Sequence, residues 1–451
     1  MIRRHLAALA LAATVVLGAV PAGAAPAEPA PPPAPAAVLT PTAVVGATAP
    51  VPSERRLAKL LTPLLASPAL GARTAVSVVD AATGTELYES FGGRAQIPAS
   101  TTKLLTALAV LQALGPDARL TTRVVTGGRE SRLVLVGGGD QTLARAPTDG
   151  GSAEGQRLRP ASLDDLADGT VAALERQGRD KVSLRYDTSL FSGPATAPSW
   201  PSSYVASGVV SPVVALAVDG GRTGPGQLSR SSDPALTAAE YFAGRLRAAG
   251  VTVTGRPKPA TAAAEATELA AVQSPTVADL VEHMLTVSDD DLAEGLAHLA
   301  GAAQGEGSFA GGAQATIATL RSLGVATTST VLRDGSGLSR QDAVPPSVLT
   351  AALAAAMVPG DRTSGLWPVW SGLPVAGLTG TLADRFVGAA ATGRGVVRAK
   401  TGTLTGVNAL AGTVRDHRGR LLTFAVLTDG TVEKYAAQAQ LDRIAAALAS
   451  A

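Results

Sequence analysis

Three short stretches of this chain place hydroxyl groups close to lysines, a combination that suits nucleophilic catalysis. The first is Ser100-Thr101-Thr102-Lys103, which follows a proline at the predicted start of a helix. Residues three apart lie on the same face of a helix, so Ser100 Oγ and Lys103 Nζ can meet. A serine hydroxyl needs an adjacent base to act as a nucleophile, and a lysine serves when its surroundings favour the neutral amine. The other interpretation is that Ser100 only caps the helix.

The second stretch is Ser288-Asp289-Asp290-Asp291, which lies at a break between two predicted helices. One interpretation is a helix start, with Ser288 as the N-cap and the acidic residues in the first turn. That interpretation leaves open a catalytic role for the Ser288 hydroxyl.

The third stretch is Lys400-Thr401-Gly402-Thr403. The pattern predicts a strand over 395–400 that ends in a turn at Thr401-Gly402. A lysine and two hydroxyls suit a substrate carboxylate, and the edge of a strand can pair with an extended peptide. An ordinary strand end and turn is the alternative.

The composition excludes several other chemistries. The chain has 451 residues, a formal net charge of +2 and no cysteine. Thiol catalysis, cysteine-ligated metal and disulfides are therefore excluded, and no basic run indicates nucleic-acid binding. Beyond the N-terminal segment the histidines are His283, His298 and His417, whose spacing fits no metal site, and there is no Gly-x-Ser-x-Gly or phosphate-binding loop. We expect neither a metal nor a cofactor, and no nucleic-acid partner.

The N-terminus has the pattern of a secretory signal peptide over residues 1–24. Arg3-Arg4-His5 is basic, an apolar run follows, and Ala22-Gly23-Ala24 fits a cleavage site. The apolar run is short for a membrane span, which needs about 20 residues. An uncleaved anchor is the alternative, and we expect any membrane contact to be peripheral. Residues 25–52, rich in proline and alanine, predict an extended linker, so the folded part begins near Ser53 and works in the cell envelope or outside the cell.

The rest of the chain falls into three parts. Residues 53–117 predict a helix, two strands and the helix opened by Ser100, and residues 270–451 predict several helices, three antiparallel strands and a terminal helix. An antiparallel sheet with helices is an α+β arrangement. Between these parts, residues 118–269 alternate strands and helices, which indicates a separate, mixed α/β insert.

Two local patterns predict further elements. In the insert, the apolar run over 213–218 predicts a strand. In the last part, Ser274 followed by Pro275 predicts the start of a helix, because serine is a favoured N-cap and proline a favoured first residue.

Taken in order, Ser-x-x-Lys, Ser-Asp-x and Lys-Thr-Gly resemble the signature of serine β-lactamases and penicillin-binding proteins. The chain is similar to the class C low-molecular-mass penicillin-binding proteins, the D-alanyl-D-alanine carboxypeptidase/endopeptidase family. Other stretches that match this family are Gly137-Gly138-Gly139-Asp140, Asp334-Gly335-Ser336-Gly337-Leu338-Ser339, Gly380-Thr381-Leu382 and the continuation of the third stretch to Gly406. The resemblance implies a serine β-lactamase/penicillin-binding transpeptidase-like fold, in which 53–117 and 270–451 form one penicillin-binding domain.

The resemblance also implies catalytic roles. Ser100 would be the acylated nucleophile, and Lys103 would be the base that takes its proton. Ser288 would relay a proton to the leaving D-alanine nitrogen, and Lys400 would support that relay and supply positive potential. The implied substrates are peptidoglycan stem peptides ending in D-Ala-D-Ala, with β-lactam antibiotics as covalent inhibitors.

Substrate binding is implied for Asp290, Thr401, Gly402 and Thr403. The two threonines would hold the terminal carboxylate of the peptide. The backbone N–H groups of Ser100 and Thr403 would form the oxyanion hole, in which each donor contributes about 2.7–4 kcal/mol to transition-state stabilisation.

Asp290 departs from the family, whose second motif ends in asparagine. An asparagine amide donates and accepts hydrogen bonds, whereas an ionised aspartate only accepts. Asp290 can therefore pair with Lys103 and hold it protonated, which weakens the base. We predict an enzyme with reduced or altered activity. The alternatives are a peptidoglycan-binding homologue without activity and a β-lactamase, although the insert argues against the latter.

Overall fold

The computed structural model describes residues 48–451 except 127–130, 149–157, 225, 358–362 and 364. The predicted signal peptide and most of the predicted linker lie outside the described residues, so both remain predictions.

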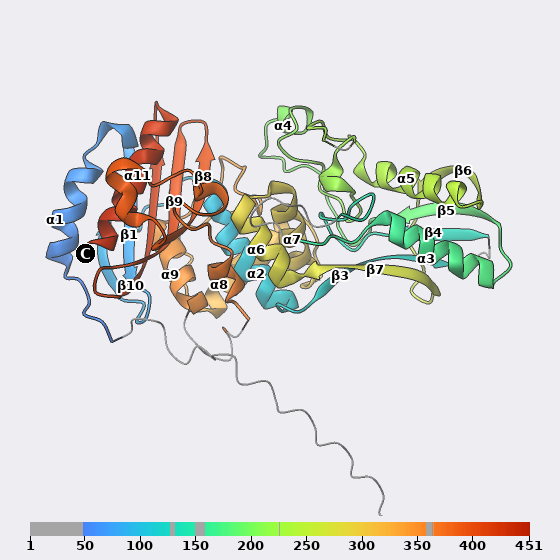
Figure 1. Ribbon diagram of the computed structural model, residues 1–451, viewed down its shortest axis with the longest axis horizontal. Coiled ribbons are helices and arrows are strands. Elements are labelled where there is room, and N and C mark those ends of the chain that lie inside the picture. The colour runs from blue at the N-terminus through green and yellow to red at the C-terminus, as the bar shows by residue number, and fades with distance from the viewer. Residues whose placement is uncertain (1–47, 127–130, 149–157, 225, 358–362, 364) are drawn as a thin grey trace, which may run out of the picture. The chain divides into compact units, whose positions relative to one another are not determined.

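The first sheet joins the two ends of the folded chain (Figure 1). Its strand order is β2-β1-β10-β9-β8, and every neighbouring pair is antiparallel. The register of β1 on β10 runs from Arg73 opposite Asp429 to Asp80 opposite Leu422. The bounds are β1 (Arg73–Asp80), β2 (Glu86–Ser90), β8 (Val397–Leu404), β9 (Val407–Arg415) and β10 (Leu421–Asp429). The predicted α+β arrangement is confirmed.

Side chains alternate between the two faces of this sheet, because successive residues of a strand point in opposite directions. On β9, Leu410 belongs to the same buried cluster as α1 (Glu54–Leu65) and α11 (Lys434–Ala449), whereas Ala409 and Ala411 belong to the cluster around α2 (Lys103–Leu114). The sheet thus lies between two helical layers.

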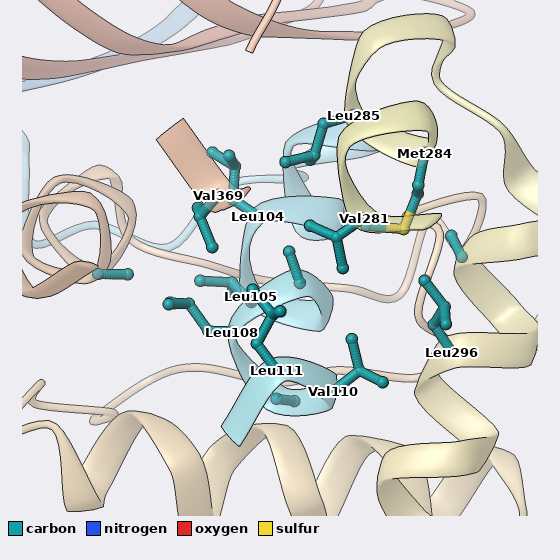
Figure 2. Packing of buried hydrophobic residues seen from close by; sticks show 14 of the residues in the cluster. Leu104, Leu105, Leu108, Val110, Leu111, Val281, Met284, Leu285, Leu296 and Val369 are labelled. Carbon is teal, nitrogen blue, oxygen red and sulfur yellow. The ribbon is translucent and has the colours of Figure 1, made fainter. Parts of the chain in front are cut away.

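Helix α2 is buried along most of its length, as its apolar sequence predicts. Figure 2 shows its leucines and Val110 surrounded by side chains of neighbouring helices, among them Met284, Leu296 and Val369. The other helices of this layer are α6 (Val277–Val287), α7 (Asp290–Ala302), α8 (Phe309–Ser322), α9 (Pro346–Met357) and α10 (Pro368–Ser371). A lysine at the start of α2 therefore enters a site that is already shielded from water.

A second sheet, with strand order β6-β5-β4-β3-β7, makes up the insert. It is mixed, because β3 pairs antiparallel with β4 and β7, whereas β4–β5 and β5–β6 are parallel. Its elements are β3 (Arg119–Thr126), β4 (Arg132–Val136), α3 (Leu163–Arg176), β5 (Lys181–Asp187), α4 (Ser203–Ala206), α5 (Pro234–Ala248), β6 (Thr252–Pro259) and β7 (Glu268–Thr276). Strand β7 extends past residue 269, where the sequence placed the end of the insert.

The predicted helix start at Ser274 is wrong. Strand β7 continues to Thr276, and Thr276 caps α6 in a capping box with Asp279. Ser274 Oγ instead accepts a hydrogen bond from the backbone N–H of Leu120 on β3, at 2.9 Å. Sheet pairing with β3 therefore overrides the local preference of the Ser-Pro pair for a helix start.

The predicted strand over 213–218 is also wrong, because this segment is irregular. All but one of its apolar side chains are buried, and its backbone bonds to a loop: Ala215 O accepts from Gly139 N at 2.8 Å. An apolar run signals burial, and periodicity alone does not distinguish a buried strand from a buried loop.

Candidate active site

Ser100 lies in a single 3₁₀ turn, η2 (Ala99–Thr102), directly before α2. The side chain makes no capping hydrogen bond, so the interpretation of Ser100 as a helix cap is wrong. Ala99 has a φ of 47°, a strained conformation for a residue with a Cβ. Close approaches hold this turn: a Cβ on Gly337 would lie 1.9 Å from Ala99 O, and one on Gly402 would lie 2.8 Å from Pro98 O. Both glycines therefore let the backbone pack against the turn that carries Ser100.

Lys103 is the first residue of α2 and its side chain is fully buried. Its Nζ lies 3.1 Å from Ser100 Oγ, 2.6 Å from Asp290 Oδ1 and 2.9 Å from the carbonyl oxygen of Ser336. The predicted meeting of Ser100 and Lys103 is present in the structure. So is the predicted pairing of Lys103 with Asp290.

Ser288 joins α6 to α7 in the left-handed conformation, with a φ of 64°. The N-cap of α7 is Asp289, whose Oδ1 accepts from the backbone N–H of Leu292 at 2.9 Å, so the prediction of Ser288 as the cap is wrong. The turn leaves the Ser288 hydroxyl to accept from Lys400 Nζ at 2.8 Å. It also starts α7 at Asp290, beside Lys103.

Lys400 lies inside β8, which runs on to Leu404, so the predicted turn at Thr401-Gly402 is wrong. The side chain is fully buried and also donates to Thr401 O at 2.9 Å. Burial lowers the pKa of Lys400 well below the ordinary 10.5, the nearby charge of Lys103 lowers it further, and Asp290 opposes the shift. Lys400 is thus the lysine whose surroundings favour the neutral amine.

The two threonines of the third stretch are held by groups to which the sequence assigned no role. Thr401 Oγ1 lies 2.9 Å from Thr381 Oγ1, on the short turn η4 (Gly380–Leu382). Thr403 Oγ1 accepts from Gln438 Nε2 of α11 at 3.3 Å. β8 comes last in the strand order of the first sheet, as the predicted pairing with an extended peptide requires.

The structure thus brings the three stretches to one place, through direct contacts of Lys103 with Asp290 and of Lys400 with Ser288. The residues missed are Ser336, Thr381 and Gln438. Ser336 and Thr381 lie in stretches that match the family, but the group used at Ser336 is a backbone carbonyl, which side-chain chemistry does not reveal. Among the residues that the structure describes, no His, Asp and Glu side chains are grouped in threes or more to hold a metal ion.

Comparison with known families identifies the chain. The D-Ala-D-Ala carboxypeptidase 3 (S13) family model matches residues 57–230 and 223–450. The chain belongs to this family. It is 38% identical over 410 residues to Carboxypeptidase DacB of Mycolicibacterium smegmatis, with 89% of this chain and 86% of the relative covered. It is 32% identical over 437 residues to the D-alanyl-D-alanine carboxypeptidase of an Actinomadura species, with 81% and 80% covered.

A solved structure shows the same fold as this carboxypeptidase family member. Penicillin binding protein 4 of Haemophilus influenzae matches with a TM-score of 0.70 at 22% identity, over 86% of this chain and 97% of the other. The predicted family and the predicted penicillin-binding fold are both confirmed. Within the described parts of the carboxypeptidase, the helices are too short or too polar to cross a membrane.

Proposed function

We propose that Ser100 is the nucleophile of this serine-type D-alanyl-D-alanine carboxypeptidase and that Lys103 is its base. The observation that carries the proposal is the 3.1 Å contact between Ser100 Oγ and Lys103 Nζ, next to the 2.8 Å contact between Ser288 Oγ and Lys400 Nζ. One hydroxyl–lysine pair suits attack and the other suits departure of the leaving group.

In acylation, Ser100 Oγ bonds to the carbonyl carbon of the penultimate D-alanine while its proton passes to Lys103. The backbone N–H groups of Ser100 and Thr403 are the donors for the oxygen that gains charge. The amide C–N bond then breaks and the departing amine takes one proton, so that the proton lost by Ser100 is balanced. The Ser288 hydroxyl, which contacts Lys400, hands a proton to the amine, and the proton that Lys103 took from Ser100 replaces it through this relay. Water then cleaves the ester and releases the shortened peptide.

Lys400 and the threonines on either side of Gly402 form the site for the terminal carboxylate. A substrate carboxylate next to Lys400 favours the ammonium form and so opposes the effect of burial on its pKa. Binding of the peptide therefore raises the positive charge of the site when it is needed. A β-lactam acylates Ser100 in the same way, but its amine stays tethered after the ring opens.

Asp290 modifies this scheme. Its carboxylate lies 2.6 Å from Lys103 Nζ, and this ion pair competes with transfer of the Ser100 proton to the amine. This contact also favours the second candidate function, a peptidoglycan-binding homologue with weak activity or none. We favour the enzyme, because the contacts of Ser100 with Lys103 and of Ser288 with Lys400 support it.

The substrates we propose are peptidoglycan stem peptides that end in D-Ala-D-Ala, and the compartment is the cell envelope or the exterior, reached through the predicted signal peptide. Incubation of the purified chain with fluorescent penicillin tests the chemistry. We expect a covalent adduct that is stable to denaturing electrophoresis and is lost in Ser100→Ala. A wild-type chain that binds penicillin without forming an adduct would instead identify the binding homologue.

A further inference from the structure

Two of the groups that surround Lys103 each lie next to a buried acid. Asp290 directly precedes Asp291, and Ser336 follows Asp334 by two residues. Asp291 is 7% exposed and Asp334 is 3% exposed. Whatever holds these two acids also fixes the position of the groups that Lys103 contacts.

Asp291 is held by the insert. Its Oδ2 lies 2.7 Å from Arg230 Nη2, and the two side chains are 7% and 5% exposed. Its Oδ1 accepts from the backbone N–H of Ser211 at 2.6 Å. Arg230 and Ser211 lie between β5 and α5, in the part of the insert that leaves its sheet. The first turn of α7, which carries Asp290, is thus tied to the insert by a buried ion pair and a backbone hydrogen bond.

Asp334 is held by the same part of the insert. Its Oδ2 accepts from Trp200 Nε1 at 2.7 Å and from Ser339 N at 2.6 Å, and its Oδ1 accepts from Gly337 N at 2.8 Å. The Asp334 carboxylate therefore holds the backbone of the loop from Asp334 to Ser339 and also connects this loop to Trp200. The indole also packs edge-on against Phe309, at 5.2 Å between ring centroids.

The loop is fixed on its other side by α7. Glu294 is fully buried, and its Oε1 accepts from Ser336 N at 2.8 Å and from Gly335 N at 3.1 Å. The Ser336 carbonyl, which accepts from Lys103, therefore belongs to a peptide that is held on both sides. Trp200 supplies the side that comes from the insert.

We propose that Trp200 and Arg230 of the insert are positioning residues for Lys103. They act through Asp334 and Asp291 on the Ser336 carbonyl and on Asp290. The insert thereby takes part in acylation without touching the substrate. This inference rests on the proposed role of Lys103 as the base for Ser100. A displacement of about 1 Å in a catalytic group can cost about 100-fold in rate, so even a small shift of these acceptors is measurable.

The test separates non-covalent binding of benzylpenicillin from acylation by stopped-flow measurements on the full chain. In Trp200→Phe, which keeps a ring and removes the indole N–H, we expect the acylation rate constant to fall about tenfold with the dissociation constant unchanged. The matched control is Trp370→Phe, which removes an indole hydrogen bond to Thr413 Oγ1 (3.2 Å) outside the site. We expect the control to acylate at the wild-type rate.

Arg230→Gln tests the second tie, and Arg230→Lys is measured beside it because it keeps the charge next to Asp291. We expect Arg230→Gln to acylate more slowly and Arg230→Lys to recover part of the rate. Arg420→Gln is the control, since Arg420 forms a buried ion pair with Asp80 at the far end of β1.

Equal acylation rate constants in wild type and Trp200→Phe would overturn the inference while leaving the proposed function intact. The same loss in Trp370→Phe as in Trp200→Phe would also overturn it, because the effect would then be a general one on stability. No adduct in the wild-type chain would overturn the proposed function and this inference with it.

Discussion

Lys103 Nζ and Asp290 Oδ1 lie 2.6 Å apart, with the lysine side chain fully buried and the aspartate side chain 23% exposed. An ion pair thus stands where the related motif places an amide beside the lysine. The carboxylate can only accept, so it favours the protonated lysine, whereas an amide can accept from a neutral or a charged amine. In the proposed mechanism, the charge at position 290 therefore governs how readily Lys103 takes the proton of Ser100.

Asp290→Asn should speed acylation by penicillin at neutral pH. Asparagine removes the negative charge that lies 2.6 Å from Lys103 Nζ, so the amine is no longer held in an ion pair when it takes the proton of Ser100. The rate of adduct formation, compared in the two proteins at neutral pH, measures the effect. Asp289→Asn is the control, because asparagine caps α7 as well as aspartate does and the change removes a neighbouring charge. Equal rates in wild type and Asp290→Asn would show that this position does not limit the base.

Lys400→Met should abolish most acylation and alter how stability depends on pH. The folded state lowers the pKa of Lys400 from 10.5, so between the folded and the unfolded pKa the unfolded chain binds more protons. The contribution of Lys400 to the free energy of unfolding therefore rises with pH between these two pKa values. Urea unfolding of both proteins at several pH values tests this prediction. Wild type should gain stability relative to Lys400→Met as the pH rises towards 10.5, and parallel curves would contradict the lowered pKa of the buried lysine.

Glu294→Gln should weaken a pH dependence of stability whose sign is opposite to that caused by Lys400. Burial, followed by the charge of Asp334, raises the pKa of Glu294 to about 8 from 4.5. The folded state then binds more protons than the unfolded state between these values, so wild-type stability falls as the pH rises from 4.5 to 8. Thermal unfolding at pH 5 and pH 8 should show a smaller fall in Glu294→Gln. Glu240→Gln, at an exposed carboxylate on α5, should leave the wild-type dependence unchanged.

Thr381→Val should weaken turnover of a D-Ala-D-Ala peptide. The Thr381 hydroxyl contacts the Thr401 hydroxyl at 2.9 Å. Removing the Thr381 hydroxyl takes away a contact that orients Thr401, which we assign to binding of the substrate carboxylate. A lost hydrogen bond of about 1 kcal/mol corresponds to a roughly fivefold lower kcat/KM. We expect most of the change in KM, measured by release of D-alanine. Thr170→Val, which removes a hydroxyl bonded to Leu166 O within α3 of the insert, should leave kcat/KM as it is.

Much of the fold was predictable because its elements carry strong local patterns. The two strands predicted within residues 53–117 are β1 and β2, and the three antiparallel strands and terminal helix predicted within residues 270–451 include β8, β9, β10 and α11. The errors at Ser274 and at 213–218 have one cause in common. In each case contacts with a segment distant in the sequence decide the local structure, and no window of neighbouring residues contains that information.

The sequence by itself determined the chemistry of this protein: Ser100 with Lys103 one turn away, a second serine followed by an acid, and a lysine followed by two threonines. Residue type and spacing suffice for this, because a helical turn dictates which side chains share a face. Only the tertiary structure decided that Lys400 contacts Ser288 and that the predicted pairing of Lys103 with Asp290 is present. It alone showed that the Ser336 carbonyl and the insert residue Trp200 belong to the same network. Such contacts depend on how distant segments pack, and the sequence does not indicate which backbone carbonyl will accept a hydrogen bond.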